Sequence, residues 1–155
     1  MKVKEIMTKE VNSISPDVSA WEGLMELSKN RISGLPVIDE RDKLVGMFTE
    51  KDVLSFILPS YVEKVGRFIY EENPKGTKRK MNELRKLKVS QLMRKEVIST
   101  KEEVTLCEIA RVMLTQKARR LPVLDANGKV IGIIAREDVL KAFIKESEED
   151  KKQNA

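Results

Sequence analysis

The sequence predicts a mixed α/β (α+β) fold built from two copies of one strand–helix–strand–strand–helix unit. The first observation is an internal repeat: at an offset of 86 residues, residues 2–54 lie over residues 88–140 without a gap. The second is that each copy joins apolar residues at helical spacing to short β-branched runs. A gapless repeat of this length indicates one structural unit used twice.

Identical residues run through the whole repeat. They include Val3/Val89, Met7/Met93, Val18/Val104, Leu35/Leu121, Pro36/Pro122, Val37/Val123, Gly46/Gly132 and Asp52-Val53-Leu54 over Asp138-Val139-Leu140. Several of the other pairs exchange one apolar residue for another, as Phe48 and Ile134 do. The two copies are therefore expected to share one set of elements.

The elements follow the same order in both copies. Short extended segments are expected at 11–14 and 97–99, before helices at roughly 17–30 and 103–117. Buried strands follow at 35–38 and 121–124, and strands return at 44–48 and 130–134. The polar turns between them are 39–42 and 125–128, and the second carries the Asn-Gly signal of a hairpin. Helices at 50–58 and 136–145 close the two units.

The remaining residues set the predicted domain boundaries. Pro59 is expected to end or kink the preceding helix, 61–71 to form an amphipathic helix, and 73–76 to break it. Residues 78–88 form a basic helical stretch, and the charged tail beyond Glu146 is expected to be disordered. The predicted organisation is a first repeat at 1–58, a connector at 59–87, a second repeat at 88–146 and a tail at 147–155.

Composition excludes several functions. The chain has no histidine, which removes the commonest general base and zinc ligand, and no nucleophile constellation is recognisable. Its one cysteine, Cys107, cannot form an internal disulfide and fits a reducing cytoplasm. No apolar run is long enough to span a membrane. The net charge of +5 is a mild excess. We therefore expect a cytoplasmic, non-enzymatic protein without a cofactor or a metal.

The blocks 31–54 and 118–140 resemble the CBS motif, which makes the chain similar to a tandem CBS-domain pair (Bateman module). The resemblance covers two stretches of 53 residues. It implies two βαββα units about a pseudo-twofold axis, with clefts that bind AMP, ADP, ATP or S-adenosylmethionine. It also implies a regulatory role for a protein that assembles as a homodimer and relays its ligand state to an unknown regulated partner.

The turn from Thr49 to Asp52 has two interpretations. The structural one is a helix N-cap, because Thr-x-x-Asp fits a capping box. The functional one is a ligand site, because a carboxylate in the first helical turn can accept hydrogen bonds from both ribose hydroxyls. The second copy keeps Asp138 but replaces the threonine by Ala135. An aspartate needed only for the box has less reason to recur without its partner, so this favours the ribose role. Ala135 departs from the family pattern and puts the second site in doubt.

Residues just before the strand proline form the second candidate element. Ser33-Gly34 and Arg119-Arg120 occupy positions where the family contacts phosphate or base, and guanidinium groups match phosphate oxygens. The alternative for the arginines is a role in capping a helix end. The ligand-binding set that the resemblance implies is Asn12, Ser33, Gly34, Met47, Thr49, Asp52, Ile98, Arg119, Arg120, Ile133, Arg136 and Asp138.

The basic stretch 78–88 supports a competing function, an accessory protein that binds nucleic acid. It holds six lysines and arginines and one glutamate. The structural alternative is a solvated helix face with Met81, Leu84 and Leu87 turned inward. No aromatic residues interleave with the charge, so nucleic-acid binding is the disfavoured interpretation.

Overall fold

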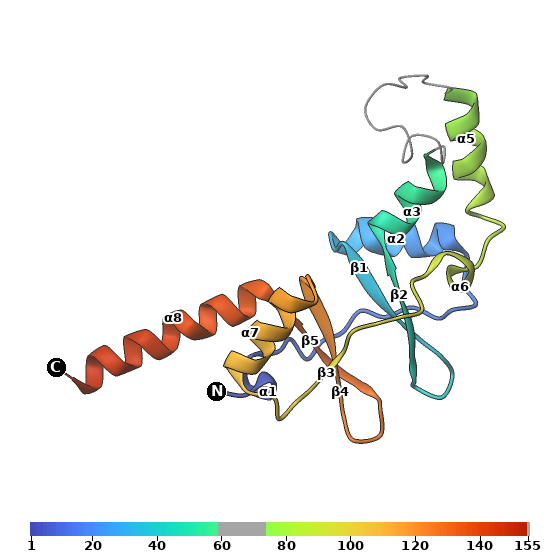
Figure 1. Ribbon diagram of the computed structural model, residues 1–155. Coiled ribbons are helices and arrows are strands. Elements are labelled where there is room, and N and C mark those ends of the chain that lie inside the picture. Colours follow the sequence, from blue (N-terminus) through green and yellow to red (C-terminus); the bar gives the residue numbers. More distant parts are fainter. Residues whose placement is uncertain (59–73, 155) are drawn as a thin grey trace. The chain divides into compact units, whose positions relative to one another are not determined.

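The computed structural model describes residues 1–58 and 74–154 (Figure 1). The chain alternates helices with short strands, as the repeat predicts. Its elements are α1 (Val3–Ile6), α2 (Ala20–Asn30), β1 (Gly34–Ile38), β2 (Leu44–Thr49), α3 (Glu50–Ile57), α5 (Pro74–Glu83), α6 (Val89–Leu92), β3 (Thr100–Lys101), α7 (Leu106–Thr115), β4 (Arg120–Leu124), β5 (Val130–Ala135) and α8 (Arg136–Gln153).

These elements form two compact units whose limits differ from those of the repeat. Unit 1 combines Met1–Val11 with Ile98–Ala155, and unit 2 spans Asn12–Val97. Each unit has its own hydrophobic core of buried side chains. The first residues of each repeat therefore belong to the unit that contains most of the other repeat. We call residues 1–11 and 88–97 the leading segments.

Unit 2 is built on a hairpin. Strands β1 and β2 pair antiparallel, and Ile14 adds a parallel bridge to Val37. Burial alternates along β2, where Gly46 and Phe48 point into the unit, and residues 35–37 of β1 are buried. Helices α2 and α3 contribute Ala20, Leu27 and Val53 to the same core.

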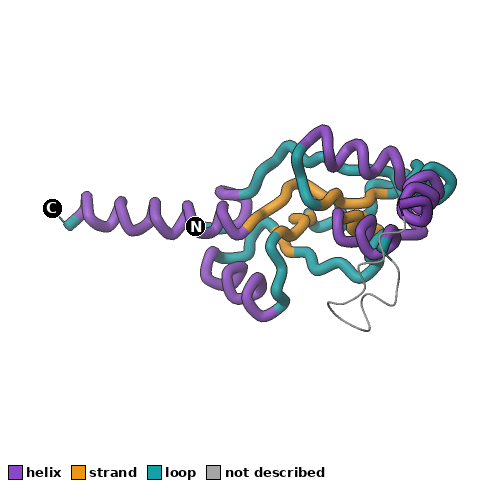
Figure 2. The backbone as a smooth tube through the Cα atoms, turned by 90° about the horizontal axis from the view of Figure 1, so that it is seen from above, coloured by secondary structure: helices purple, strands orange, loops and turns teal. Residues whose placement is uncertain are grey.

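Unit 1 repeats this plan with a complete sheet. β3 pairs parallel with β4, and β4 pairs antiparallel with β5. Helices α7 and α8 contribute Ile109, Met113 and Val139 to its core. The order β3–α7–β4–β5–α8 is the predicted strand–helix–strand–strand–helix unit. In Figure 2, α8 runs outward past the other elements of this unit.

The leading segments are held by matching hydrogen bonds. The N–H of Val3 donates to the carbonyl of Val104 (2.9 Å), and the N–H of Val89 donates to the carbonyl of Val18 (2.9 Å). Val3 and Val89 occupy the same position of the repeat, and both are 0% exposed. Each leading segment thus supplies a core side chain, and burying a valine stabilises a unit by roughly 1.5–3 kcal/mol.

The leading segments also continue the sheets. Thr8 forms an antiparallel bridge with Ile133 of β5, and Arg94 forms one with Met47 of β2. Gly46 and Gly132 leave room for this approach. A Cβ on Gly46 would lie 2.8 Å from the carbonyl oxygen of Arg94, and one on Gly132 would lie 3.1 Å from that of Thr8. The glycine shared by both repeats is therefore explained by close backbone contact.

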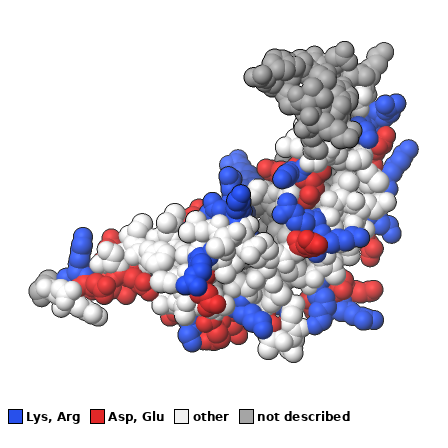
Figure 3. Space-filling view, viewed as in Figure 1, with Lys and Arg blue, Asp and Glu red and all other residues white. Residues whose placement is uncertain are grey.

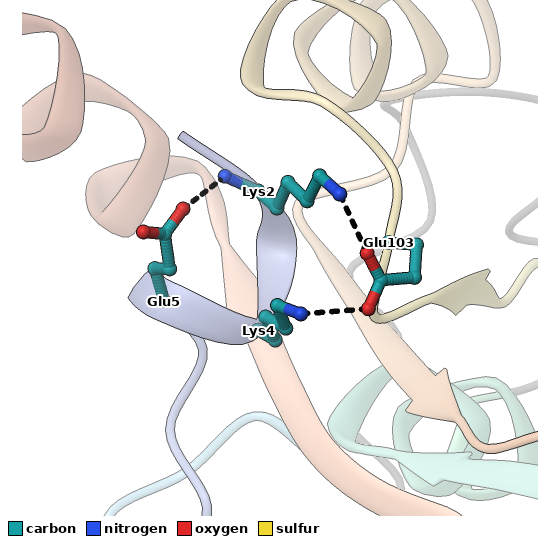
Figure 4. Close-up of polar contacts among 4 residues, drawn as sticks. All are labelled: Lys2, Lys4, Glu5 and Glu103. Carbon is teal, nitrogen blue, oxygen red and sulfur yellow. Dashed lines mark hydrogen bonds and ion pairs between the residues drawn. The ribbon is translucent and has the colours of Figure 1, made fainter.

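An exposed ion-pair cluster ties the leading segment of unit 1 to the turn before α7 (Figure 4). The ammonium groups of Lys2 and Lys4 each lie 2.7 Å from one carboxylate oxygen of Glu103. Hydrogen bonds from these lysines lower the pKa of Glu103 from 4.5 to about 2 and raise that of Lys4. The equivalent pair in unit 2, Lys88 with Asp17, is longer, at 4.0 Å.

A pH dependence of stability follows from this cluster. Because the pKa of Glu103 is lower in the folded chain, its stabilising effect is complete above about pH 4.5 and is lost as the pH falls toward about 2. Glu103→Gln should therefore lower the urea midpoint slightly at pH 6 and leave it unchanged at pH 2, since exposed pairs contribute little. Glu96→Gln, which removes an exposed carboxylate outside this cluster, is the matched control. An equal shift at both pH values would contradict the assigned role.

Several expected boundaries were wrong. Helices α2 and α7 begin three residues later than predicted, because Ser19 and Thr105 cap them by accepting the N–H of Glu22 and Glu108. The extended segment expected at 97–99 precedes the strand, which is Thr100–Lys101. In the first copy, the segment at 11–14 forms only the bridge at Ile14.

The tail and connector also differ from expectation. Residues 147–153 continue α8, so the prediction of a disordered tail was wrong. Lysine and glutamate are good helix formers, and Glu148 precedes Lys152 by one helical turn. The break expected at 73–76 falls partly within α5, which begins at Pro74, a residue suited to the first helical position. The basic helix ends at Glu83 instead of continuing to 88. Pro59 and the helix expected at 61–71 lie outside the described residues.

The hairpin of the second copy is confirmed, but its turn is not the two-residue Asn-Gly type. Among residues 125–128 only Gly128 has a positive φ, 80°. The Asp125 carboxylate accepts the N–H groups of Asn127 and Lys129 (2.9 Å each). This is a three-residue loop that closes on a left-handed glycine. Asp42, with φ of 61°, stands at the same place in the first copy.

Candidate ligand-binding site

The candidate residues fall into two equivalent sets of six, one in each unit. Unit 2 holds Asn12, Ser33, Gly34, Met47, Thr49 and Asp52, and unit 1 holds Ile98, Arg119, Arg120, Ile133, Arg136 and Asp138. In each unit the set centres on the point where the second hairpin strand becomes a helix.

In unit 2, the turn from Thr49 to Asp52 is a complete capping box. The Thr49 hydroxyl accepts the N–H of Asp52 (3.3 Å), and an Asp52 carboxylate oxygen, Oδ2, accepts the N–H of Thr49 (2.9 Å). The same Oδ2 accepts the Thr49 hydroxyl proton (2.9 Å). The structural interpretation of this turn is therefore confirmed. The Thr49 proton is already donated to Asp52, so it is not free for a phosphate while this bond persists.

The backbone around this turn brings further candidates together. Gly34 pairs with Thr49 across the hairpin, and the carbonyl of Ser33 accepts the N–H of Glu50 (2.9 Å). A Cβ on Gly34 would lie 3.2 Å from Cγ2 of Thr49 and 3.5 Å from Cε of Met47. Ser33, Gly34, Met47, Thr49 and Asp52 thus form one contiguous half-site.

In unit 1, Asp138 keeps half of the capping box. Its Oδ2 accepts the N–H of Ala135 (2.8 Å), although alanine offers no hydroxyl in return. The argument that the aspartate would not recur for capping alone is therefore wrong. The Asp side of a capping box needs only the backbone N–H of the first residue, which every residue except proline supplies. Retention of Asp138 is compatible with either role.

Both aspartates keep an oxygen available. Within the described part of the chain, Oδ1 of Asp52 and Oδ1 of Asp138 accept no hydrogen bond. Both side chains are half-buried, and no buried side-chain oxygen among the described residues lacks a partner, so each Oδ1 is open to solvent. A carboxylate with one fixed and one open oxygen is oriented by the helix and can still accept from a ligand hydroxyl.

The arginines of unit 1 are gathered by the same backbone arrangement. Arg120 pairs with Ala135 across the hairpin, and the N–H of Arg136 donates to the carbonyl of Arg119 (3.0 Å). The Nε–H of Arg136 donates to the carbonyl of Ala118 (3.1 Å). All three arginine side chains are exposed. The structure thus places Arg119, Arg120 and Arg136 around the turn that holds Asp138.

Met47 and Ile133 are restricted in what they can offer. The N–H and carbonyl of Met47 are bonded to Arg94 (2.9 and 2.8 Å), and those of Ile133 are bonded to Thr8 (2.9 Å each). Their main-chain groups are therefore already used by the leading segments. Any contact from these two residues to a ligand would come from the partly buried side chains. Sequence reasoning missed Thr8 and Arg94 as neighbours of the site because pairing between repeats leaves no local signal.

Asn12 and Ile98 are distant in the sequence from the two turns that carry Asp52 and Asp138. Both are exposed, and each stands two residues before the first strand contact of its copy, at Ile14 and Thr100. Among the described residues, no hydrogen bond joins the Asn12 side chain to the other candidates of unit 2. The placement of these two residues at a ligand remains a prediction.

The basic stretch packs against unit 2 instead of standing free. Leu84 is 0% exposed, and Met81 and Leu87 lie against the same core. The Lys80 ammonium lies 4.7 Å from the centre of the Phe56 ring, and the Arg85 guanidinium lies 3.9 Å from that of Trp21. On the face seen in Figure 3, basic and acidic side chains are interspersed. This geometry favours the solvated amphipathic face over a nucleic-acid patch.

The described residues hold no candidate metal site and no candidate membrane span. No cluster of three or more His, Cys, Asp or Glu side chains in 1–58 and 74–154 could hold a metal ion. No helix in those ranges has the length and apolar character needed to cross a membrane.

Two strand–helix–strand–strand–helix units with matching capped turns define a tandem-repeat α+β module. The CBS domain family matches the chain twice, at residues 3–59 and 89–145. Together these matches cover more than half of the sequence. The chain therefore belongs to the CBS-domain family and carries two CBS domains, as the resemblance predicted.

Relatives and solved structures agree with this assignment. The chain is 34% identical over 151 residues to the chloroplastic CBS domain-containing protein CBSX1 of Arabidopsis thaliana. The aligned residues cover 92% of this chain and 64% of CBSX1. It is 33% identical over 140 residues to inosine-5'-monophosphate dehydrogenase of Methanocaldococcus jannaschii, covering 90% of the chain but only 23% of the dehydrogenase. The crystal structure of CBSX2 from A. thaliana in complex with AMP superposes with a TM-score of 0.72 at 28% identity, covering 94% of this chain and 98% of the crystallised CBSX2 chain.

Proposed function

We propose that this protein is a non-enzymatic sensor that binds adenosine-containing ligands and relays the bound state to a partner protein. The observation that carries the proposal is the pair of aspartates, Asp52 and Asp138, fixed at equivalent helix starts with one carboxylate oxygen open to solvent. The AMP complex of CBSX2, which shares this fold, supports the ligand class. AMP, ADP and ATP are the first candidates, and S-adenosylmethionine is the next.

Each half-site would hold its own ligand through the residues of one unit. The open oxygen of each aspartate would accept hydrogen bonds from ribose hydroxyls. Gly34, which has no side chain, would let the backbone of unit 2 approach the base. Arg119 and Arg120 would contact phosphate oxygens. Binding would shift the population of conformations that the partner recognises, without chemical change to the ligand.

The decisive experiment is a calorimetric titration of the purified protein with AMP, ADP, ATP and S-adenosylmethionine. It should be repeated with Asp52→Asn and Asp138→Asn, because asparagine keeps an oxygen that can accept the capping N–H but removes the charge. We expect saturable binding and a loss of at least tenfold in affinity, about 1.4 kcal/mol, for a variant whose half-site is occupied.

Two controls make this titration interpretable. Asp150→Asn, an exposed substitution near the end of α8, should bind as the wild type does, and thermal unfolding should show that all variants are folded. If both half-site variants are folded and keep wild-type affinity, the ribose role is wrong. If none of the four ligands binds, the sensor function itself is wrong.

We also propose that the protein is a cytoplasmic homodimer. In unit 1, Leu114 of α7 is 75% exposed, and Leu140 and Ile144 of α8 are 64% and 59% exposed. These apolar side chains lie on two helices that pack against each other, and such exposure on neighbouring helices marks an interaction surface. A second copy of the chain is the occupant that the family resemblance suggests.

The dimer can be tested by sedimentation. The wild type is expected to sediment at twice the chain mass of 17.8 kDa, and Leu140→Glu with Ile144→Glu should yield a folded monomer. Leu54→Glu, which alters an exposed leucine of α3 at the position equivalent to Leu140, is the matched control for unit 2. A wild type that sediments as a monomer at high concentration would contradict the proposal.

A further inference from the structure

The two units differ in charge at the turn that carries the proposed ligand site. Unit 2 presents Ser33, Gly34, Thr49, Glu50, Lys51 and Asp52, and the equivalent residues of unit 1 are Arg119, Arg120, Ala135, Arg136, Glu137 and Asp138. In unit 2 one lysine stands against two carboxylates, a formal charge of −1. In unit 1 three arginines stand against two carboxylates, a formal charge of +1. The residues just before them, Arg31 and Lys117, carry the same charge in both units.

The arginines of unit 1 are held close together without acidic partners. Main-chain bonds join Arg136 to Arg119 and set Arg120 beside Ala135. The ion pairs among the described residues involve none of these three arginines. The Nε–H of Arg136 is donated to Ala118, which fixes the side chain and leaves its terminal nitrogens available. Three exposed guanidinium groups around one turn create a positive potential that favours an anion with several oxygens.

The corresponding turn of unit 2 lacks this potential. Glu50 stands where unit 1 has Arg136. It is exposed, and it shares the first turn of α3 with Asp52. The Thr49 hydroxyl donates its proton to Asp52, so it does not act as a free donor. Lys51 is exposed and is the single cation within the turn. Each additional phosphate on a ligand would therefore meet two carboxylates here.

We propose, resting on the function given above, that the two half-sites select adenosine ligands by charge. Unit 1 takes the ligand with two or three phosphates, and unit 2 takes the ligand with one phosphate or none. The two copies of the repeat would then report different ligands, so the protein would respond to their ratio instead of to a single concentration.

The test is a titration of the full chain with ATP, AMP and adenosine in the background of each aspartate variant, which isolates one half-site at a time. With Asp52→Asn, the remaining half-site should prefer ATP to adenosine at least tenfold. Adding Arg119→Gln and Arg120→Gln should remove that preference while adenosine binding is retained. Arg79→Gln with Lys86→Gln removes equal charge elsewhere and should leave the preference intact.

A converse substitution tests unit 2. In the Asp138→Asn background, Ser33→Arg should raise ATP affinity at least fivefold and make ATP binding more sensitive to salt. Saturable binding with the same ATP preference in both half-sites, or with the preference intact after loss of Arg119 and Arg120, would overturn charge selection and leave the sensor function standing. Absence of binding for every ligand would overturn both proposals together.

Discussion

Gly23→Ala is expected to lower the free energy of unfolding of unit 2 by about 1–3 kcal/mol. Gly23 lies inside α2, where alanine would be the better helix former by about 1 kcal/mol, so helix propensity alone predicts the opposite sign. Packing decides the outcome. A Cβ on Gly23 would lie 2.6 Å from Cε1 of Phe48 and 3.1 Å from Cγ2 of Val89. Phe48 is 0% exposed and belongs to the core of unit 2, where close packing opposes movement of its ring.

The second repeat supplies the matched control for this substitution. The positions equivalent to Gly23 and Phe48 are Ile109 and Ile134, which share one core in unit 1. A small residue beside a large one in unit 2 is thus replaced in unit 1 by two isoleucines of intermediate size. Gly23→Ala in a Phe48→Ile background should therefore stabilise the protein relative to Phe48→Ile alone. Chemical unfolding of the four proteins gives the coupling between the two sites. Additive effects would show that the ring does not limit the size of residue 23.

Gly46→Ala is expected to destabilise unit 2 by a similar amount, about 1–3 kcal/mol. The new Cβ would lie 2.6 Å from Sδ of Met93 and 2.8 Å from the carbonyl oxygen of Arg94. A methionine side chain can move, but the Arg94 carbonyl accepts the N–H of Met47 (2.9 Å). To relieve the clash, the leading segment would have to withdraw and lengthen the bonds that hold it to β2.

Gly132→Ala is the control for Gly46→Ala. A Cβ on Gly132 would lie 3.1 Å from the carbonyl oxygen of Thr8, which is the nearest backbone atom. Its closest contact, at 2.5 Å, would again be with a methionine sulfur, Sδ of Met7. Because a flexible side chain can give way more readily than backbone, the unit 1 variant should lose less stability. Thermal unfolding of both variants measures the difference. A larger loss for Gly132→Ala would contradict the role assigned to the Arg94 backbone.

The Gly46 and Gly132 substitutions concern a position that the repeat identified without explaining. Gly46 and Gly132 are identical in the alignment of the chain with itself, yet the sequence does not say what approaches them. The structure provides the cause: the leading segment of the opposite repeat. Truncation of residues 1–11 would therefore remove a part of the core of unit 1, although these residues belong to the first repeat.

Much of the candidate site could be predicted because its signals are local. Thr49 and Asp52 are three residues apart, and the capping box they form depends only on that spacing. The positions Ser33-Gly34 and Arg119-Arg120 were predicted from family resemblance, and the hairpins bring both pairs beside the helix starts. The use of the Met47 and Ile133 backbones by Arg94 and Thr8 was not predictable, because those contacts join residues that are distant in the sequence.

The sequence by itself determined the α+β class, the two-fold use of one unit, the hairpin strands and the CBS family, because each depends on residue order within a repeat or on the match between the two repeats. Tertiary structure alone decided which leading segment completes which unit, why Gly23 must lack a side chain, and that Asp138 still caps a helix without a threonine. The first two features depend on contacts between residues that are distant in the sequence. The third depends on a backbone N–H that almost any residue supplies, so no local pattern encodes these features.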